Sequence, residues 1–192
     1  RPARHRWPRL CAGRNAAGNP PLPTMANWVI EHNDIYDNNL SPNPAPPGTF
    51  QSVLPPGIGV LLSGVSDHEV IDNHVKGNNY VGIAVLGWCS GLGLTPQECQ
   101  LRPDGDLRAP PGSENNLVAR NYLSKNATDA EPPPGFPLPP ADIVYAQPLE
   151  AALGYGTAGN CFEDNEPDGF TAFSWPPFPD GSTLPSDLPS DC

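Results

Sequence analysis

The sequence predicts an all-β solenoid, in which short strands are wound into coils and each coil stacks on the next. Three observations support this prediction. A polar motif recurs along the chain, an apolar motif recurs between its copies, and most of the 28 prolines lie outside both. A recurring unit determines the architecture more strongly than the preferences of single residues. The segments between the motifs are expected to be long, proline-rich loops.

The polar motif starts with Asn or Asp and has a large apolar residue three positions later. Asn follows at positions six and eleven after the start, with an aliphatic residue at position eight. The motif occupies residues 27–38, 67–78 and 115–126, and a fourth copy starts at Gly159 and diverges after Asn165. Each copy predicts two short strands that meet at an Asn.

The apolar motif predicts a third strand in each coil. Residues 59–64 and 82–87 match each other, and residues 142–145 look like a later copy without its glycines. One complete coil therefore runs from residue 59 to residue 81. It contains three strands of a few residues each, which is typical of one turn of a solenoid.

The Asn between the two strands of the polar motif is expected to form the corner. A tight corner requires a left-handed backbone, which Asn adopts more readily than most residues. Stacked side-chain amides can also hydrogen bond to one another. We therefore predict a structural ladder, rather than a ligand site, formed by Asn33, Asn73, Asn121 and Asn165.

Alternation along each strand predicts which side chains point into the core. The predicted core consists of Val60, Leu62, Ile83, Val85, Ile143 and Tyr145 from the apolar motif, Ile30, Val70, Val118 and Phe162 from the first strand of the polar motif, and Ile35, Val75 and Leu123 from its second strand.

With these motifs the chain resembles the right-handed parallel β-helix proteins of the pectate-lyase-like superfamily, above all the bacterial parallel β-helix repeat (PbH1) proteins. The resemblance implies a right-handed parallel β-helix of about four coils over residues 26–166, as the C-terminal part of a longer helix. Residues 1–25 are expected to be disordered or non-native, and residues 167–192 to form a coiled tail or cap. The aromatic residues expected to cover the last coil are Phe170, Phe173, Trp175 and Phe178.

Charge and hydropathy limit the classes of partner. The net charge is −11, and half of the ten basic residues lie within residues 1–14, so the remainder of the chain is strongly acidic. Such a body repels phosphate, so a nucleic acid is not expected as a partner. No apolar run is long enough to span a membrane. A polysaccharide or a partner protein fits better, and open end coils would allow self-association.

The five cysteines predict disulfides rather than a metal site, because none has the spacing of zinc ligands. We expect Cys89 to pair with Cys99 and Cys161 to pair with Cys192. Such pairing indicates an extracellular or periplasmic location. The alternative is five reduced thiols in a cytosolic protein.

The long loops follow the apolar-motif strand or the second strand of the polar motif, so they should flank the outer face of the apolar-motif strands as a groove. Its floor would consist of Leu61, Ser63, Ala84, Leu86 and Val144, with Asp142 at one end. Glycoside hydrolases require two carboxylates about 5–10 Å apart, and one Asp does not meet this requirement. The sequence therefore assigns no catalytic residue.

A second candidate site is a polar patch on the strands of the polar motif. It consists of His32, Asp34, Asp67, His68, Asp72 and His74. Such side chains can transfer protons or bind a metal ion, or they can simply form a solvated outer face. At one stacked position, His32, Asp72, Arg120 and Asp164 alternate in charge, which favours a row of ion pairs. No metal or other cofactor is predicted; calcium is the one alternative left open, and no motif supports it.

The sequence leaves three functions open. The first is a secreted or envelope-associated β-helix module without catalysis in this chain, which binds a glycan or a protein. The second is the C-terminal part of a polysaccharide lyase or glycoside hydrolase, with its catalytic residues on preceding coils. The third is a purely structural solenoid. The ligand and the oligomeric state are not indicated.

Overall fold

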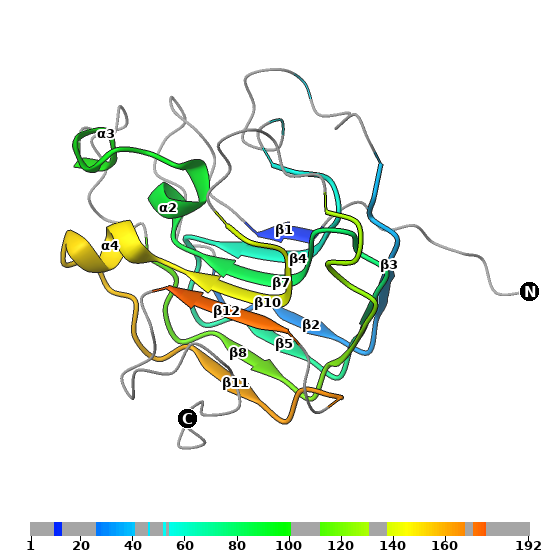
Figure 1. The fold of residues 1–192 in the computed structure, drawn as a ribbon. Coiled ribbons are helices and arrows are strands. Elements are labelled where there is room, and N and C mark those ends of the chain that lie inside the picture. The colour runs from blue at the N-terminus through cyan, green and yellow to red at the C-terminus, as the bar shows by residue number, and fades with distance from the viewer. Residues whose placement is uncertain are drawn as a thin grey trace, which may run out of the picture.

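A computed structural model of the protein describes residues 10–12, 26–40, 46, 52, 54–100, 112–130, 138–167 and 171–175. These residues are mostly β, with three parallel sheets and a few helices of five residues each (Figure 1). The all-β parallel class predicted from the motifs is therefore confirmed. None of the helices within the described ranges has the length and apolar character needed to cross a membrane.

The first sheet contains the apolar-motif strands. Its members, in spatial order, are β1 (Leu10–Ala12), β4 (Ile58–Ser63), β7 (Val81–Leu86), β10 (Ala141–Ala146) and β12 (Ala172–Trp175). All neighbours are parallel, and they lie side by side in Figure 1. The register pairs Val60 with Ile83, and Ile83 with Ile143, so equivalent positions of the motif stack directly.

The polar motif supplies the other two sheets. The second sheet consists of β2 (Val29–Glu31), β5 (Glu69–Ile71), β8 (Leu117–Ala119) and β11 (Cys161–Glu163). The third sheet consists of β3 (Asp34–Tyr36), β6 (His74–Lys76) and β9 (Tyr122–Ser124). The chain visits the sheets in the same order each time. We number the coils accordingly: β1 to β3 form the first, β4 to β6 the second, β7 to β9 the third, and β10 and β11 belong to the fourth.

One hydrophobic cluster joins the three sheets. It contains every residue predicted to point inward, and adds Val65 from the turn after β4. Most members of the cluster are fully or almost fully buried. Burial of an aliphatic side chain stabilises a fold by about 1.5–3 kcal/mol, so these stacked rows are the main source of stability.

The predicted open groove is wrong. Its floor residues on the first sheet, among them Leu61, Leu86 and Val144, are at most 2% exposed. They form a second buried cluster together with Leu54 and Tyr80 from neighbouring segments. The outward side chains of this sheet are themselves apolar, so covering them is favourable. The central strands of the first sheet, β4, β7 and β10, are therefore buried on both faces, as is usual for parallel sheets.

Strands occur in both terminal segments, where none was expected. β1 lies within residues 1–25 and pairs with β4. β12 lies within residues 167–192 and pairs with β10. In β12 Ala172 packs against the first cluster and Phe173 against the second, so apolar side chains reach both sides of the sheet. Most of the rest of both segments, including Phe170 and Phe178, lies outside the described residues.

Short helices follow two strands of the first sheet, where the sequence predicted loops. These are α2 (Trp88–Leu92) and α3 (Pro96–Gln100) after β7, and α4 (Pro148–Ala152) after β10. The predicted disulfide between Cys89 and Cys99 is present, with a Cα–Cα distance of 5.7 Å. Cys161 is also disulfide-bonded. Cys192 lies outside the described residues, so its pairing with Cys161 stays a prediction.

Candidate functional site

Polar side chains gather at the three corners of each coil. At the corner between the second and third sheets, Asn33, Asn73, Asn121 and Asn165 form a row that we call the Asn33 ladder. Each side-chain amide donates to the next side-chain oxygen, with Nδ2–Oδ1 distances of 3.1, 3.0 and 3.0 Å. The same oxygens accept the backbone N–H of the preceding member at 3.0–3.1 Å. The ladder therefore joins four successive coils.

The left-handed backbone at this corner belongs to a different residue from the one predicted. It is the residue before each Asn that has positive φ, namely His32, Asp72, Arg120 and Asp164 at 55°, 54°, 54° and 45°. The amides of Asn33 and Asn73 then donate back to the carbonyls two positions earlier, of Glu31 at 2.8 Å and of Ile71 at 2.9 Å. The residue with positive φ therefore changes the direction of the chain, and the Asn after it stabilises the corner by hydrogen bonding.

A second row, the Asn38 ladder, lies at the corner after the third sheet. Asn38, Asn78 and Asn126 repeat the same amide contacts, at 3.0 and 3.1 Å. The row ends on Asp142, whose Oδ1 accepts the amide of Asn126 at 3.0 Å. The other oxygen of Asp142 accepts the N–H and hydroxyl of Thr171, at 3.0 and 2.9 Å. Asp142, the only acid at the predicted groove, thus links the ladder to the segment that leads into β12.

A third row, the His68 ladder, lies at the corner before the second sheet. The backbone N–H of His68 donates to Oδ1 of Asn116 at 3.0 Å, and the amide of Asn116 donates to Asn160 at 2.9 Å. On the other side the ring of Trp28 stacks on the imidazole, with centroids 6.0 Å apart. Trp28 is 47% exposed, so it covers this end of the row while remaining in contact with solvent.

His68 is the most unusual member of the predicted polar patch, because its side chain is fully buried. Its Nδ1 lies 2.7 Å from the carbonyl oxygen of Ser66, so Nδ1 carries the hydrogen and donates it. Its Nε2 is buried and has no hydrogen-bond partner in the described structure. Burial lowers the pKa of His68, against the opposing effects of the Ser66 carbonyl and Asp67.

The other patch residues lie on the surface at separate places. Nδ1 of His74 is 3.5 Å from a carboxylate oxygen of Asp34, and both side chains are about two-thirds exposed. Asp72 receives two hydrogen bonds from Arg120, at 2.9 and 2.8 Å, which hold the pKa of Asp72 below its usual range. Asp67 accepts the amide of Asn115 at 3.4 Å.

The remaining patch residue, His32, lies 3.7 Å from the carboxylate of Glu31. The six residues therefore do not converge on one site. Within the described ranges, no three His, Cys, Asp or Glu side chains are grouped so that they could hold a metal ion.

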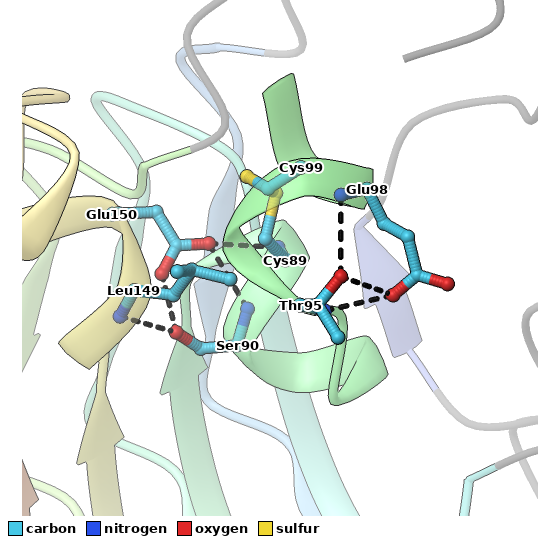
Figure 2. The surroundings of a disulfide bond; sticks show 7 residues. All are labelled: Cys89, Ser90, Thr95, Glu98, Cys99, Leu149 and Glu150. Carbon is cyan, nitrogen blue, oxygen red and sulfur yellow. Dashed lines mark hydrogen bonds between the residues drawn. A yellow bond between two sulfur atoms is a disulfide. The ribbon is translucent and has the colours of Figure 1, made fainter. Parts of the chain in front are cut away.

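Sequence reasoning missed a buried carboxylate beside the disulfide. Glu150 on α4 is fully buried, and its Oε1 accepts the N–H groups of Cys89 and Ser90 at 2.7 and 3.1 Å (Figure 2). Its other oxygen accepts the Ser90 hydroxyl at 2.5 Å. A Cβ at Gly87 would lie 2.0 Å from the carboxylate carbon, so this position requires glycine. The carboxylate compensates the free N–H groups that begin α2.

A signal for this carboxylate was present in the sequence. Glu150 is the single charged residue in a stretch that is otherwise apolar or small, from residue 148 to residue 154. A lone acid in such a stretch is expected to be buried with a partner. Its partners could not be found in the same way, because they are backbone N–H groups some 60 residues away.

A buried amide links the third and fourth coils in a similar way. Oε1 of Gln147 accepts the backbone N–H of Ser113 at 2.6 Å, and its Nε2 donates to the Ser113 carbonyl at 2.9 Å. The same Nε2 lies 3.2 Å from the Tyr145 hydroxyl, which donates to Thr157 at 2.9 Å. Burial raises the pKa of Tyr145. These polar groups, like the ladders, are used in contacts between segments.

Comparison with known proteins identifies no relative. No family model, no curated protein and no solved structure matches the chain. The function must therefore be argued from the geometry.

Proposed function

We propose that this chain is a right-handed parallel β-helix module related to the pectate-lyase-like repeat proteins, and that it binds a partner outside the reducing cytoplasm without catalysing a reaction. The fixed order in which the chain visits its three parallel sheets supports the helix. Three disulfide-bonded cysteines, Cys89, Cys99 and Cys161, support an oxidising location.

The main support for the proposal is that the candidate polar groups contact other parts of the chain. Asp142 at the predicted groove is bonded to Asn126 and Thr171. Glu150 is bonded to the start of α2, and His68 is enclosed between Trp28 and Asn116. A catalytic acid or base must reach the reacting atom. These three groups contact other parts of the chain instead, which favours a rigid framework that presents a surface.

The surface best suited to binding is the outer side of β3, β6 and β9. Asp34, His74 and Tyr122 form a row across these strands, in register. The rings of His74 and Tyr122 are 5.5 Å apart, and Tyr122 is 44% exposed. A flat row that combines an exposed aromatic ring with hydrogen-bonding groups suits a saccharide or a protein loop. We propose this row as the contact surface for a glycan, the ligand class that the family resemblance implies.

Two measurements test the proposal. First, the purified chain is incubated with a panel of polysaccharides. We expect no release of unsaturated or reducing ends, and release would show that the chain is an enzyme. Secondly, binding to the same panel is measured for the parent and for Tyr122→Ala.

The matched control for the binding measurement is Leu40→Ala. Leu40 is an exposed apolar residue, 63% accessible, outside the row. We expect Tyr122→Ala to weaken binding at least about fivefold, since loss of an aromatic contact costs on the order of 1–3 kcal/mol. Leu40→Ala should bind like the parent. Equal loss in both variants, or binding of a protein but of no glycan, would contradict the glycan surface.

A further inference from the structure

The position of His68 in its ladder differs from that of the residues below it. Asn116 and Asn160, at the equivalent positions of the next two coils, donate their side-chain amides to Val65, Asn160 and Ser113. The amide nitrogen and the oxygen of both side chains therefore have hydrogen-bond partners at any pH. His68 satisfies only Nδ1, and its buried Nε2 can remain without a partner only while the ring is neutral.

Protonation would place a hydrogen on Nε2 in surroundings that offer no acceptor within the described residues. An unpaired buried donor is costly, and a charged one more so. On one side of His68 lies Asn116, whose Oδ1 accepts the backbone N–H of His68 and whose amide donates to Val65 and Asn160. On the other side lies Trp28, which is about half exposed. The imidazolium can therefore reach water most easily by displacing Trp28.

The carboxylates around His68 do not remove this cost. Asp67, the preceding residue, acts to raise the pKa of His68, but burial outweighs it. Glu69 on β5 is exposed. Glu114, which pairs with Ser66 on the adjacent coil, lies with its carboxylate against Gly156. On the first coil the facing residue is the uncharged Trp28.

We propose that His68 is an acid-sensitive latch that holds residues 26–40 of the first coil against the second, and that a proton from solvent on Nε2 releases them. Trp28 belongs to the segment that would move. Its backbone carbonyl also accepts the N–H of Glu69 at 2.8 Å. The N–H of Asn27 donates to the backbone carbonyl of Asp67 at 2.9 Å. In a solenoid each coil contacts only its neighbours, so one coil can open locally while the others remain folded.

The direction of the pH dependence follows from the linkage between protonation and opening. His68 has a lowered pKa in the closed coil and an ordinary one, about 6.5, when the coil is open. The stability of the closed coil is therefore complete above about pH 6.5. It decreases as the pH falls from there toward the lower pKa of the closed form.

Hydrogen exchange of the full chain tests the latch. Protection of peptides from residues 26–40 is compared at about pH 7.5 and about pH 5, with correction for the intrinsic exchange rate. Protection at the lower pH should fall by up to about tenfold for each unit by which the closed-state pKa lies below the ordinary value. Peptides from residues 141–152, in the fourth coil, should not change. If the protection of residues 26–40 were the same at both pH values, the proposal would be overturned.

Two variants separate His68 from the other histidines. His68→Asn places at this position the residue found in the next two coils, and should abolish the pH dependence. His32→Asn changes an exposed histidine whose printed ion pair is with Glu31 of its own segment, and should retain the pH dependence. If His68→Asn kept the full pH dependence, the proposal would be wrong.

A measurement on the parent protein remains decisive even if His68→Asn does not fold. In an NMR titration of the histidine rings, His68 should titrate below about pH 6.5, the ordinary value for histidine. Titration of His68 at or above that value would contradict the latch.

Discussion

The side-chain amide of Asn73 donates to Oδ1 of Asn121 over 3.0 Å, although the two residues are 48 positions apart in the chain. Asn73 also receives the amide of Asn33 and donates to the carbonyls of Ile30 and Ile71. One fully buried side chain thus bonds to three coils. The stability of the stack should be especially sensitive to such a residue.

Asn73→Ala is expected to destabilise the fold by about 3 kcal/mol, because several buried partners lose their hydrogen bonds at about 1–3 kcal/mol each. The control is Asn33→Ala at the end of the ladder, whose side chain donates two hydrogen bonds, to Glu31 and Asn73. We expect a loss of about 1 kcal/mol for this variant. Urea unfolding measures both, and equal losses would show that position in the ladder is unimportant.

Glu150→Ala should also be strongly destabilising, by about 3 kcal/mol, since two backbone N–H groups and the Ser90 hydroxyl lose a buried acceptor. Glu150→Gln keeps one acceptor oxygen and should be intermediate. Glu98 offers a matched control, because it caps α3 through Thr95 while remaining exposed (Figure 2). Glu98→Ala should have a much smaller effect in the same thermal or urea unfolding experiment.

Removal of the Cys89–Cys99 disulfide by the double Ser substitution is expected to cost about 2–3 kcal/mol, on the chain-entropy estimate for a loop closed across 10 positions. Both cysteines are fully buried, so dithiothreitol should reduce this bond slowly in the folded protein and rapidly in urea. Mass spectrometry after alkylation reports the free thiols. Rapid reduction under native conditions would show that the bond is accessible.

Asp72→Asn should weaken stability slightly at low salt and at neutral pH, because the bidentate contact with Arg120 is exposed. The difference from the parent should disappear near 1 M salt, where the screening length is about 3 Å. The pKa of Asp72 is lowered in the folded protein. Its contribution is therefore present above about pH 3.9 and is lost as the pH falls through the folded-state value. A difference that persists at high salt would indicate a packing effect instead.

Much of the fold could be predicted because the motifs repeat at equivalent positions. Stacked rows such as Val60, Ile83 and Ile143 can be read from alternation and from the recurrence of the motif. The same rule failed for Leu61 and Leu86. Alternation says that these side chains point away from the core, but not whether another segment covers them. Leu54 and Tyr80, which pack in the same cluster, lie outside the two motifs.

The corners illustrate a second limit of sequence reasoning. The recurrence of the Asn predicts that it carries the left-handed backbone. The structure assigns positive φ to the preceding residue, which is His32, Asp72 or Arg120 in different coils. That position varies because its side chain points to solvent, whereas the Asn is retained because its amide must reach the next coil. The candidate site was harder to predict. His68 and Asp72 are close in sequence, which suggests one polar patch, but only His68 is buried.

Successive partners in the Asn33 ladder are 40, 48 and 44 residues apart, yet their contacts are the same to within 0.1 Å. The intervening loops therefore absorb all of the difference in length. A foreign peptide grafted into such a loop should be displayed without altering how neighbouring coils align. The loops can therefore accept grafted peptides of different lengths while the framework stays the same. This property suits the molecule to the presentation of epitopes.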